Sequence, residues 1–241
     1  MPGRRPGGPV TGPSGPRRLV LVTATATEVG KTWVAAALLS RARERGLVVA
    51  ARKPAQSFEV TPGPGPGGPL PVEPTDAQRL AAATGEDPGL VCPAGHSYAV
   101  PMAPPMAAAA LGRPAPTIED YVRTIEGSWA PGGGAPERID LAVVEGAGGV
   151  ASPLGDDGDS ADLGRALGAH VAVVVAVPSL GVINSVRLAV AALDPIPVIV
   201  HLNRFDAGDD MHWRNLEWLR GRDGLTVTTG IDDLLEALAG T

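Results

Sequence analysis

The sequence predicts an α/β fold, a three-layer α/β/α sandwich built on a mostly parallel sheet. Two observations support this prediction. Strand-length apolar runs alternate with helical patterns along the chain, and this alternation is typical of parallel strands joined by right-handed helical crossovers. The runs are continuously apolar and do not alternate between apolar and polar residues, as expected for strands that are buried on both faces.

Five apolar runs are predicted to be strands, and a weaker run is predicted to be an edge strand. The five stronger runs cover residues 18–23, 47–53, 139–145, 170–177 and 196–202, and the weaker run covers residues 225–229. The patterns between them predict helices near residues 31–45, 76–84, 117–127, 160–168, 181–193, 210–220 and 231–239. Because such sheets bind ligands beyond the carboxyl ends of their strands, the polar residues at those ends are the functional candidates.

Segments rich in glycine and proline separate these elements. Residues 1–17 have this composition and are predicted to form a disordered arm, which leaves residues 18–241 as a single domain. Residues 61–75 are predicted to be a mobile loop, and residues 130–137 a shorter connector.

Composition excludes several classes of protein. The net charge of −6 argues against nucleic-acid binding, which favours a basic face. The single cysteine, Cys92, cannot form an internal disulfide and indicates a reducing compartment. The apolar runs are too short to span a membrane, and the N-terminal segment lacks the apolar region of a secretory signal. We therefore expect a cytoplasmic protein that binds neither membranes nor nucleic acid.

The stretch "TATATEVGKT" (residues 23–32) resembles the phosphate-binding loop of P-loop NTPases. It lies between a predicted buried strand and a predicted helix, where backbone N–H groups and the helix dipole favour phosphate. We expect nucleotide to bind across residues 25–32, with Lys31 reaching the phosphates and the Thr32 hydroxyl ligating Mg²⁺. Ala24 stands where such loops usually have glycine; we expect it to extend the strand with a negative φ, so that only Gly30 is required as glycine.

Two lysines stand out because arginine supplies the other 18 positive charges. They are Lys31, in the loop, and Lys53, at the end of the second strand in "RKPAQS". Both positions therefore favour a compact ammonium over a planar guanidinium. Lys31 and Lys53 are the two candidate catalytic residues.

Two carboxylates are candidate Mg²⁺ ligands with Thr32. Glu145 ends a predicted buried strand in "VVEGAGG" (143–149), where glycines allow the backbone to approach a ligand closely. Asp76 in "TDAQRL" (75–80) is either a second metal ligand or the N-cap of the helix that begins there.

Six segments together resemble the dethiobiotin synthetase family in order and approximate spacing over residues 18–205: "TATEVGKT", "KPAQS", "TDAQRL", "PMAPPMAA" (101–108), "VEGAGG" and "GVINS" (181–185). The resemblance implies ATP- and Mg²⁺-dependent closure of a cyclic urea from 7,8-diaminononanoate and CO₂, giving dethiobiotin in biotin biosynthesis. One amine takes up CO₂ as a carbamate, ATP phosphorylates the carbamate, and the second amine displaces phosphate.

The resemblance also implies roles for residues of this chain. Lys53 would stabilise the carbamate and the transferred phosphoryl group. "GVINS" would receive the substrate carboxylate from the neighbouring subunit, which implies a homodimer with shared sites. "PMAPPMAA" would be a substrate-side loop, or else a proline-rich connector. The implied nucleotide-binding residues are Thr27, Glu28, Val29, Gly30, Lys31, Thr32 and Asn203, and the implied substrate-binding residues are Thr27, Ser57, Gly148, Gly181, Ile183 and Asn184.

The chain departs from the family pattern at three places. Ala24 and Ala26 replace glycine and aspartate in the loop, Ser185 stands where the family often has histidine, and the segment after residue 206 lacks the usual adenine loop. Two alternatives therefore remain, a P-loop nucleotide-binding switch and a non-catalytic nucleotide-binding descendant of the family. The stretch "NRFD" (203–206) is similar to the guanine-reading motif of GTP-binding switches, but Arg204 replaces its lysine; we expect Asn203 to contact adenine.

Overall fold

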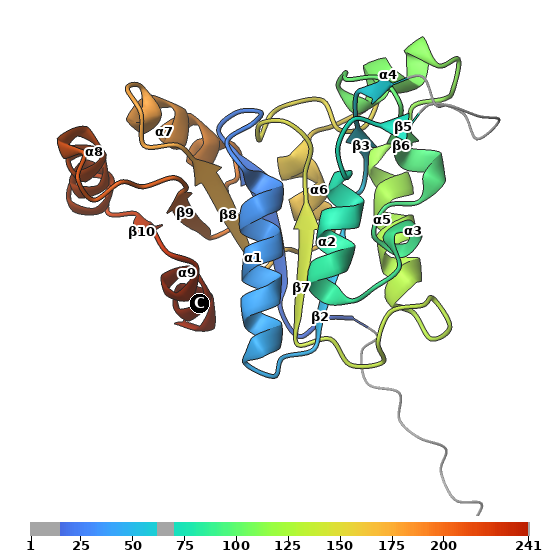
Figure 1. The fold of residues 1–241 in the computed structure, drawn as a ribbon, viewed down its shortest axis with the longest axis horizontal. Coiled ribbons are helices and arrows are strands. Elements are labelled where there is room, and N and C mark those ends of the chain that lie inside the picture. The colour runs from blue at the N-terminus through green and yellow to red at the C-terminus, as the bar shows by residue number, and fades with distance from the viewer. Residues whose placement is uncertain (1–14, 62–69, 241) are drawn as a thin grey trace, which may run out of the picture.

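The computed structural model describes residues 15–61 and 70–240, and it has the predicted three-layer architecture (Figure 1). A six-stranded parallel sheet forms the middle layer, with strand order β10-β9-β8-β1-β7-β2. The five predicted strands are present, with β2 at one edge of the sheet, and the weaker run is β10 at the other edge. Their bounds are β1 (Leu19–Ala24), β2 (Val49–Arg52), β7 (Leu141–Glu145), β8 (Val171–Ala176), β9 (Val198–Leu202) and β10 (Thr226–Thr228).

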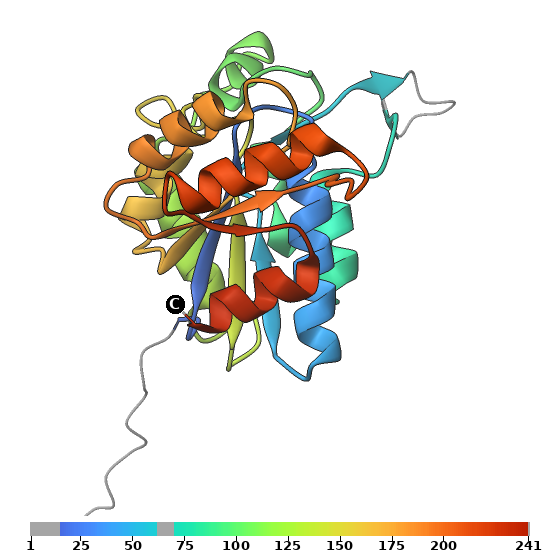
Figure 2. The ribbon, with the colours of Figure 1, turned by 90° about the vertical axis from the view of Figure 1, so that its left-hand side faces the viewer.

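All seven predicted helices are present. They are α1 (Lys31–Glu44), α2 (Asp76–Thr84), α5 (Ile118–Trp129), α6 (Ser160–Ala166), α7 (Val182–Ala192), α8 (Asp210–Gly221) and α9 (Ile231–Gly240). Helices α1, α2 and α9 share one core cluster with the sheet, whereas α5, α6, α7 and α8 pack in clusters with the other face. Figure 2 shows the β10 edge, with α8 and α9 nearest the viewer.

Strand β1 shows why the predicted strands are continuously apolar. All six of its residues are buried. Val20 and Val22 pack in the cluster with α1, whereas Leu21 packs with α6 and α7 on the opposite face. Since side chains alternate across a strand, a strand covered by helices on both faces must be apolar at successive positions.

Smaller elements surround one end of the sheet, and the sequence did not predict them. Each is only a few residues long, which is too short for a hydrophobic period to be read from the sequence. They are β3 (Gln56–Ser57), β4 (Val60–Thr61), β5 (Leu70–Pro71), α3 (Pro88–Val91), a 3₁₀ turn η1 (Ala94–His96), β6 (Ser97–Tyr98) and α4 (Pro104–Ala110).

Two expectations need correction. The segment "PMAPPMAA", expected as a loop or connector, contains the helix α4. Pro104 lies in the first turn of α4, where a backbone N–H has no acceptor within the helix, so the missing N–H of proline costs nothing there. The alanines that follow have a high helix propensity. Asp76 is not the N-cap of α2, because Thr75 has that role and forms a capping box with Gln78.

Other segment predictions are only partly tested. Residues 130–137 contain no helix or strand, as expected of a connector. Most of the predicted arm (residues 1–14) and of the predicted mobile loop (residues 62–69) lie outside the described residues. No helix among the described residues is long and apolar enough to cross a membrane.

Candidate active site

The loop between β1 and α1 has the backbone that the sequence predicts. Ala24 is the last residue of β1, pairs with Val175 of β8 and is fully buried. Ala24 is not among the residues with positive φ, whereas Gly30 has φ 96° and is the N-cap of α1. The absence of glycine at position 24 is therefore compatible with a normal loop. Glu28 also has a positive φ, 59°, which the sequence did not predict.

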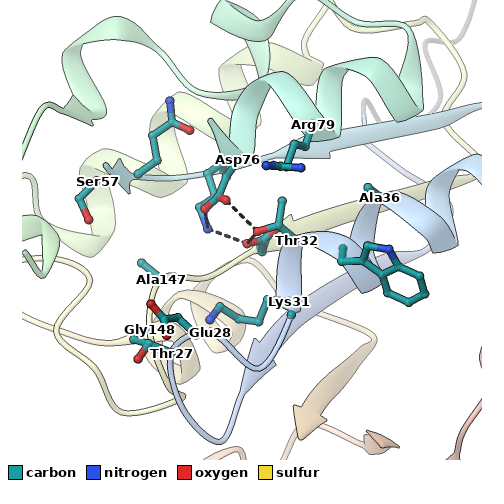
Figure 3. A pocket seen from close by; sticks show the side chains of 15 residues that line it. Thr27, Glu28, Lys31, Thr32, Ala36, Ser57, Asp76, Arg79, Ala147 and Gly148 are labelled. Carbon is teal, nitrogen blue, oxygen red and sulfur yellow. Dashed lines mark hydrogen bonds and ion pairs between the residues drawn. The ribbon is translucent and has the colours of Figure 1, made fainter. Parts of the chain in front are cut away.

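Lys31 and Thr32 form the first turn of α1 and face a pocket of about 480 Å³ (Figure 3). Lys31 is only 8% exposed, and its ammonium forms no hydrogen bond or ion pair with any residue in the described ranges. Burial lowers the pKa of Lys31, and the neighbouring charge of Lys53 lowers it further. An anionic ligand in the pocket would oppose this lowering of the pKa, because an opposite charge favours the ionised form.

A compact polar network lies beside Lys31. The Thr32 hydroxyl is 2.9 Å from Asp76 Oδ1 and 2.8 Å from Glu145 Oε1, so its one hydrogen is shared by two acceptors. The ammonium of Lys53 lies 2.8 Å from Asp76 Oδ2 and 2.7 Å from Glu145 Oε1, and it also donates to the carbonyl of Gly146 at 3.0 Å. Two strand ends (β2 and β7) and two helix starts (α1 and α2) thus bring these four side chains together, as the sequence predicts.

The titration of this network follows from burial and pairing. Burial raises the pKa of Glu145, and the charge of Lys53 opposes that rise. Burial alone would lower the pKa of Lys53, but Glu145 and Asp76 outweigh it and raise the pKa well above its ordinary value. Burial would raise the pKa of Asp76, but Lys53 outweighs it and the pKa is lowered. Lys53 is therefore a permanent cation shared by two carboxylates.

One carboxylate oxygen of Glu145 has no hydrogen-bond partner in the part of the chain that the structure describes. This atom, Oε2, is buried and has no hydrogen-bond donor among the described residues. A buried charged oxygen without a donor is unfavourable unless a ligand or ion satisfies it. With Thr32 and Asp76, it completes a set of hard oxygen donors of the kind that Mg²⁺ prefers.

The remaining pocket residues come from four segments. Of the predicted substrate-binding residues, Thr27, Ser57 and Gly148 line the pocket, and Glu28 of the phosphate loop lies beside them. The sequence did not identify five other lining residues, Trp33, Ala36, Gln56, Arg79 and Ala147. Gln56 has a supporting role that a local pattern cannot reveal, because its Oε1 accepts from the Ala77 N–H at 2.9 Å and so fixes the start of α2.

The glycines after Glu145 lie against α6 and against the phosphate loop. A Cβ on Gly146 would lie 2.3 Å from Ser160 Oγ, and a Cβ on Gly149 would touch the carbonyls of Ala24 and Thr25 at 3.4 to 3.6 Å. Only the first of these two contacts requires glycine, and a hydrogen bond from the Val150 N–H to the carbonyl of Ala24 at 2.9 Å joins the loop after β7 to the end of β1.

Five predicted site residues do not line this pocket, and one of them is Val29 of the phosphate loop. Gly181, Ile183 and Asn184 belong to the start of α7. Asn203 follows β9 and is buried, and its Nδ2 donates to the carbonyl of Val29 at 2.8 Å.

Comparison with known proteins identifies the family. A family model described as an AAA domain matches residues 18–200. The ATP-dependent dethiobiotin synthetase BioD of Anaeromyxobacter dehalogenans strain 2CP-C is 41% identical over 199 residues, which are 80% of this chain and 79% of that protein. The chain belongs to the dethiobiotin synthetase family. The protein of the same name from Rhodococcus jostii strain RHA1 is 41% identical over 176 residues, which are 73% of this chain and 67% of that protein.

Solved structures place this dethiobiotin synthetase family member among P-loop folds. The signal recognition particle receptor FtsY of Elizabethkingia anophelis has a TM-score of 0.50 at 12% identity, covering 96% of this chain and 67% of that one. A putative plasmid partition protein of Borrelia burgdorferi B31, bound to AMPPNP, also has a TM-score of 0.50. Its sequence is 11% identical, and the match covers 91% of this chain and 90% of that one. At such identities the likeness concerns the fold alone.

Proposed function

We propose that this chain is an ATP-dependent dethiobiotin synthetase, a ligase that closes the cyclic urea of dethiobiotin from 7,8-diaminononanoate and CO₂. The observation that carries the proposal is the convergence of Thr32, Asp76, Glu145 and Lys53 beside the buried ammonium of Lys31. The reaction itself is inferred from the family to which the chain belongs. Residues 18–241 would form the single synthetase domain, in a cytoplasmic protein.

Mg²⁺ is proposed to bind the oxygen atoms of Thr32, Asp76 and Glu145. The unpartnered Glu145 Oε2 and the hard donor set fit this ion. When bound, Mg²⁺ would neutralise charge on the phosphate oxygens of ATP.

The two lysines have separable roles in this proposal. Lys31, at the first turn of α1, would hold the phosphates together with the N–H groups of residues 27–32. Lys53 lies across the pocket between the two carboxylates, where its charge would stabilise the carbamate and the phosphoryl group in transfer. Because both carboxylates hold Lys53 in place before substrate arrives, little reorganisation is needed.

The substrate is proposed to bridge two subunits. Thr27, Ser57 and Gly148 line the pocket and would contact the diamine end. The N-terminus of α7, with Gly181, Ile183 and Asn184, would bind the carboxylate of a substrate held in the neighbouring subunit of a homodimer. Mixing two inactive variants, Lys31→Ala and Asn184→Ala, should then restore activity, whereas a monomer that turns over would contradict shared sites.

Asn203 is proposed to contact adenine. Its amide nitrogen already donates to Val29, which leaves the side-chain carbonyl oxygen to accept from the amino group of the base.

Product formation tests the proposal. Purified protein incubated with ATP, Mg²⁺, 7,8-diaminononanoate and bicarbonate should yield dethiobiotin, detected by mass spectrometry, and the Lys31→Ala variant should not. Tight ATP binding without product would instead favour a nucleotide-binding switch or a non-catalytic descendant.

A further inference from the structure

The segment after β9 contacts the phosphate loop from the side opposite Lys53. Asn203 donates to the carbonyl of Val29 at 2.8 Å, and the guanidinium of the next residue, Arg204, donates to the carbonyl of Glu28 at 3.3 Å. Two consecutive side chains thus hold two consecutive loop carbonyls. The fit is close, because a Cβ on Gly30 would lie 2.3 Å from Asn203 Nδ2.

Glu28 and Arg204 share an uncommon backbone conformation. They are the two non-glycine residues with positive φ in the part of the chain that the structure describes, each at 59°. Side-chain-bearing residues adopt this conformation rarely, and such residues cluster at functional sites. Here they are joined by a hydrogen bond, so both ends of a single contact have this unusual geometry.

Peptide geometry links this contact to phosphate binding. In a trans peptide the C=O of one residue and the N–H of the next point in opposite directions. Holding the carbonyls of Glu28 and Val29 toward Asn203 and Arg204 therefore turns the N–H groups of Val29 and Gly30 to the other side of the loop. N–H groups presented in this way are what a phosphate-binding loop requires.

We propose that Arg204 is a positioning residue for nucleotide binding, which holds the phosphate loop in the conformation that accepts the polyphosphate. Asn203 is buried, whereas Arg204 is exposed, so Arg204 can be replaced without disturbing the core. The inference rests on the proposed function only in that the loop binds ATP phosphates, and it assigns a role to a residue of the "NRFD" segment that the reaction does not otherwise use.

Calorimetric titration of the full chain in Mg²⁺ tests the inference with two probes, AMPPNP and inorganic tripolyphosphate. Arg204→Ala should bind both probes about tenfold more weakly, which corresponds to 1.4 kcal/mol. Arg204→Lys keeps a donor and should retain most of the affinity. The matched control is Arg214→Ala, which removes another exposed arginine, paired with Asp210 at 2.5 Å, and should bind as the wild type does. The melting temperature of the ligand-free protein should be unchanged in all three variants.

Three results would overturn the inference. Unchanged binding of both probes by Arg204→Ala would show that the contact between Arg204 and the Glu28 carbonyl does not affect nucleotide binding. A loss for AMPPNP alone would mean that Arg204 touches the nucleoside and does not position the loop. A large fall in the ligand-free melting temperature would mark the contact as a general structural one. If the wild type bound neither probe, the proposed function itself would fail, and this inference with it.

Discussion

Replacing Lys53 by methionine is the substitution whose effect on stability the structure defines best. Its ammonium lies 2.7 Å from Glu145 Oε1 and 2.8 Å from Asp76 Oδ2, and Glu145 is completely buried. Methionine retains an unbranched stem of similar length and removes the charge. Glu145 would then be a buried carboxylate that has lost its cation, and among the described residues only the Thr32 hydroxyl would still donate to it.

The expected cost depends on pH. Removing one partner of a buried ion pair typically costs about 3–5 kcal/mol, which corresponds to a fall in melting temperature of about 2–4 °C per kcal/mol for a chain of this size. Burial already raises the pKa of Glu145, and Lys53 opposes the rise, so the pKa in the folded variant climbs further above the unfolded value of about 4.3. Because Glu145 then has a higher pKa in the folded than in the unfolded variant, it binds a proton more tightly in the native state. The free energy of unfolding of the variant therefore falls as pH rises through the folded pKa.

Urea unfolding of wild type and Lys53→Met at several pH values, without nucleotide, measures the effect. We expect a deficit in the free energy of unfolding of about 3 kcal/mol near pH 8 and of about 1 kcal/mol near pH 5. The double variant Lys53→Met, Glu145→Gln removes both charges and should recover most of the loss. A deficit below about 1 kcal/mol near pH 8, or one that does not change with pH, would refute the reasoning that Glu145 is a buried anion held by Lys53.

Three further predictions concern the phosphate loop. Lys31→Ala should remove about 3 kcal/mol or more of transition-state stabilisation, measured as kcat/KM for ATP; near wild-type turnover would exclude the phosphate role. Ala24→Gly and Ala26→Asp should each change ATP affinity by less than about tenfold, because Ala24 already has strand geometry; a much larger gain would mean that the natural loop is impaired. Gly30→Ala should abolish nucleotide binding, because it combines a φ of 96° with a 2.3 Å approach to Asn203 Nδ2. The control Gly46→Ala has a φ of 83° and nothing within 4 Å and should cost only about 1 kcal/mol of stability; equal effects of the two on binding would contradict the packing argument.

The sequence predicted those parts of the site that lie at the ends of regular elements. Lys53 and Glu145 follow continuous apolar runs, and parallel strands bring their carboxyl ends to one edge, so the convergence with Thr32 could be foreseen. The position of Ala24 could be foreseen as well, because a negative φ needs no glycine.

Contacts between distant segments could not be predicted in this way. Asn203 and Val29 are separated by 174 positions, and no local period or spacing indicates that one side chain holds the carbonyl of the other. The positive φ of Glu28 could not be predicted either, since glutamate rarely adopts it and the hydrogen bond to the Glu28 carbonyl comes from Arg204, 176 positions away. Thr75 as the N-cap of α2 has a local signature, the capping box with Gln78, and it could have been recognised from the sequence.

The central claim, that this chain couples ATP cleavage to urea closure, is tested most directly by ADP release with and without the two other substrates. The account predicts little ADP from ATP and Mg²⁺ alone and a large increase when 7,8-diaminononanoate and bicarbonate are both present, with one dethiobiotin formed for each ADP. ADP release that is the same with and without the diamine and bicarbonate would contradict it.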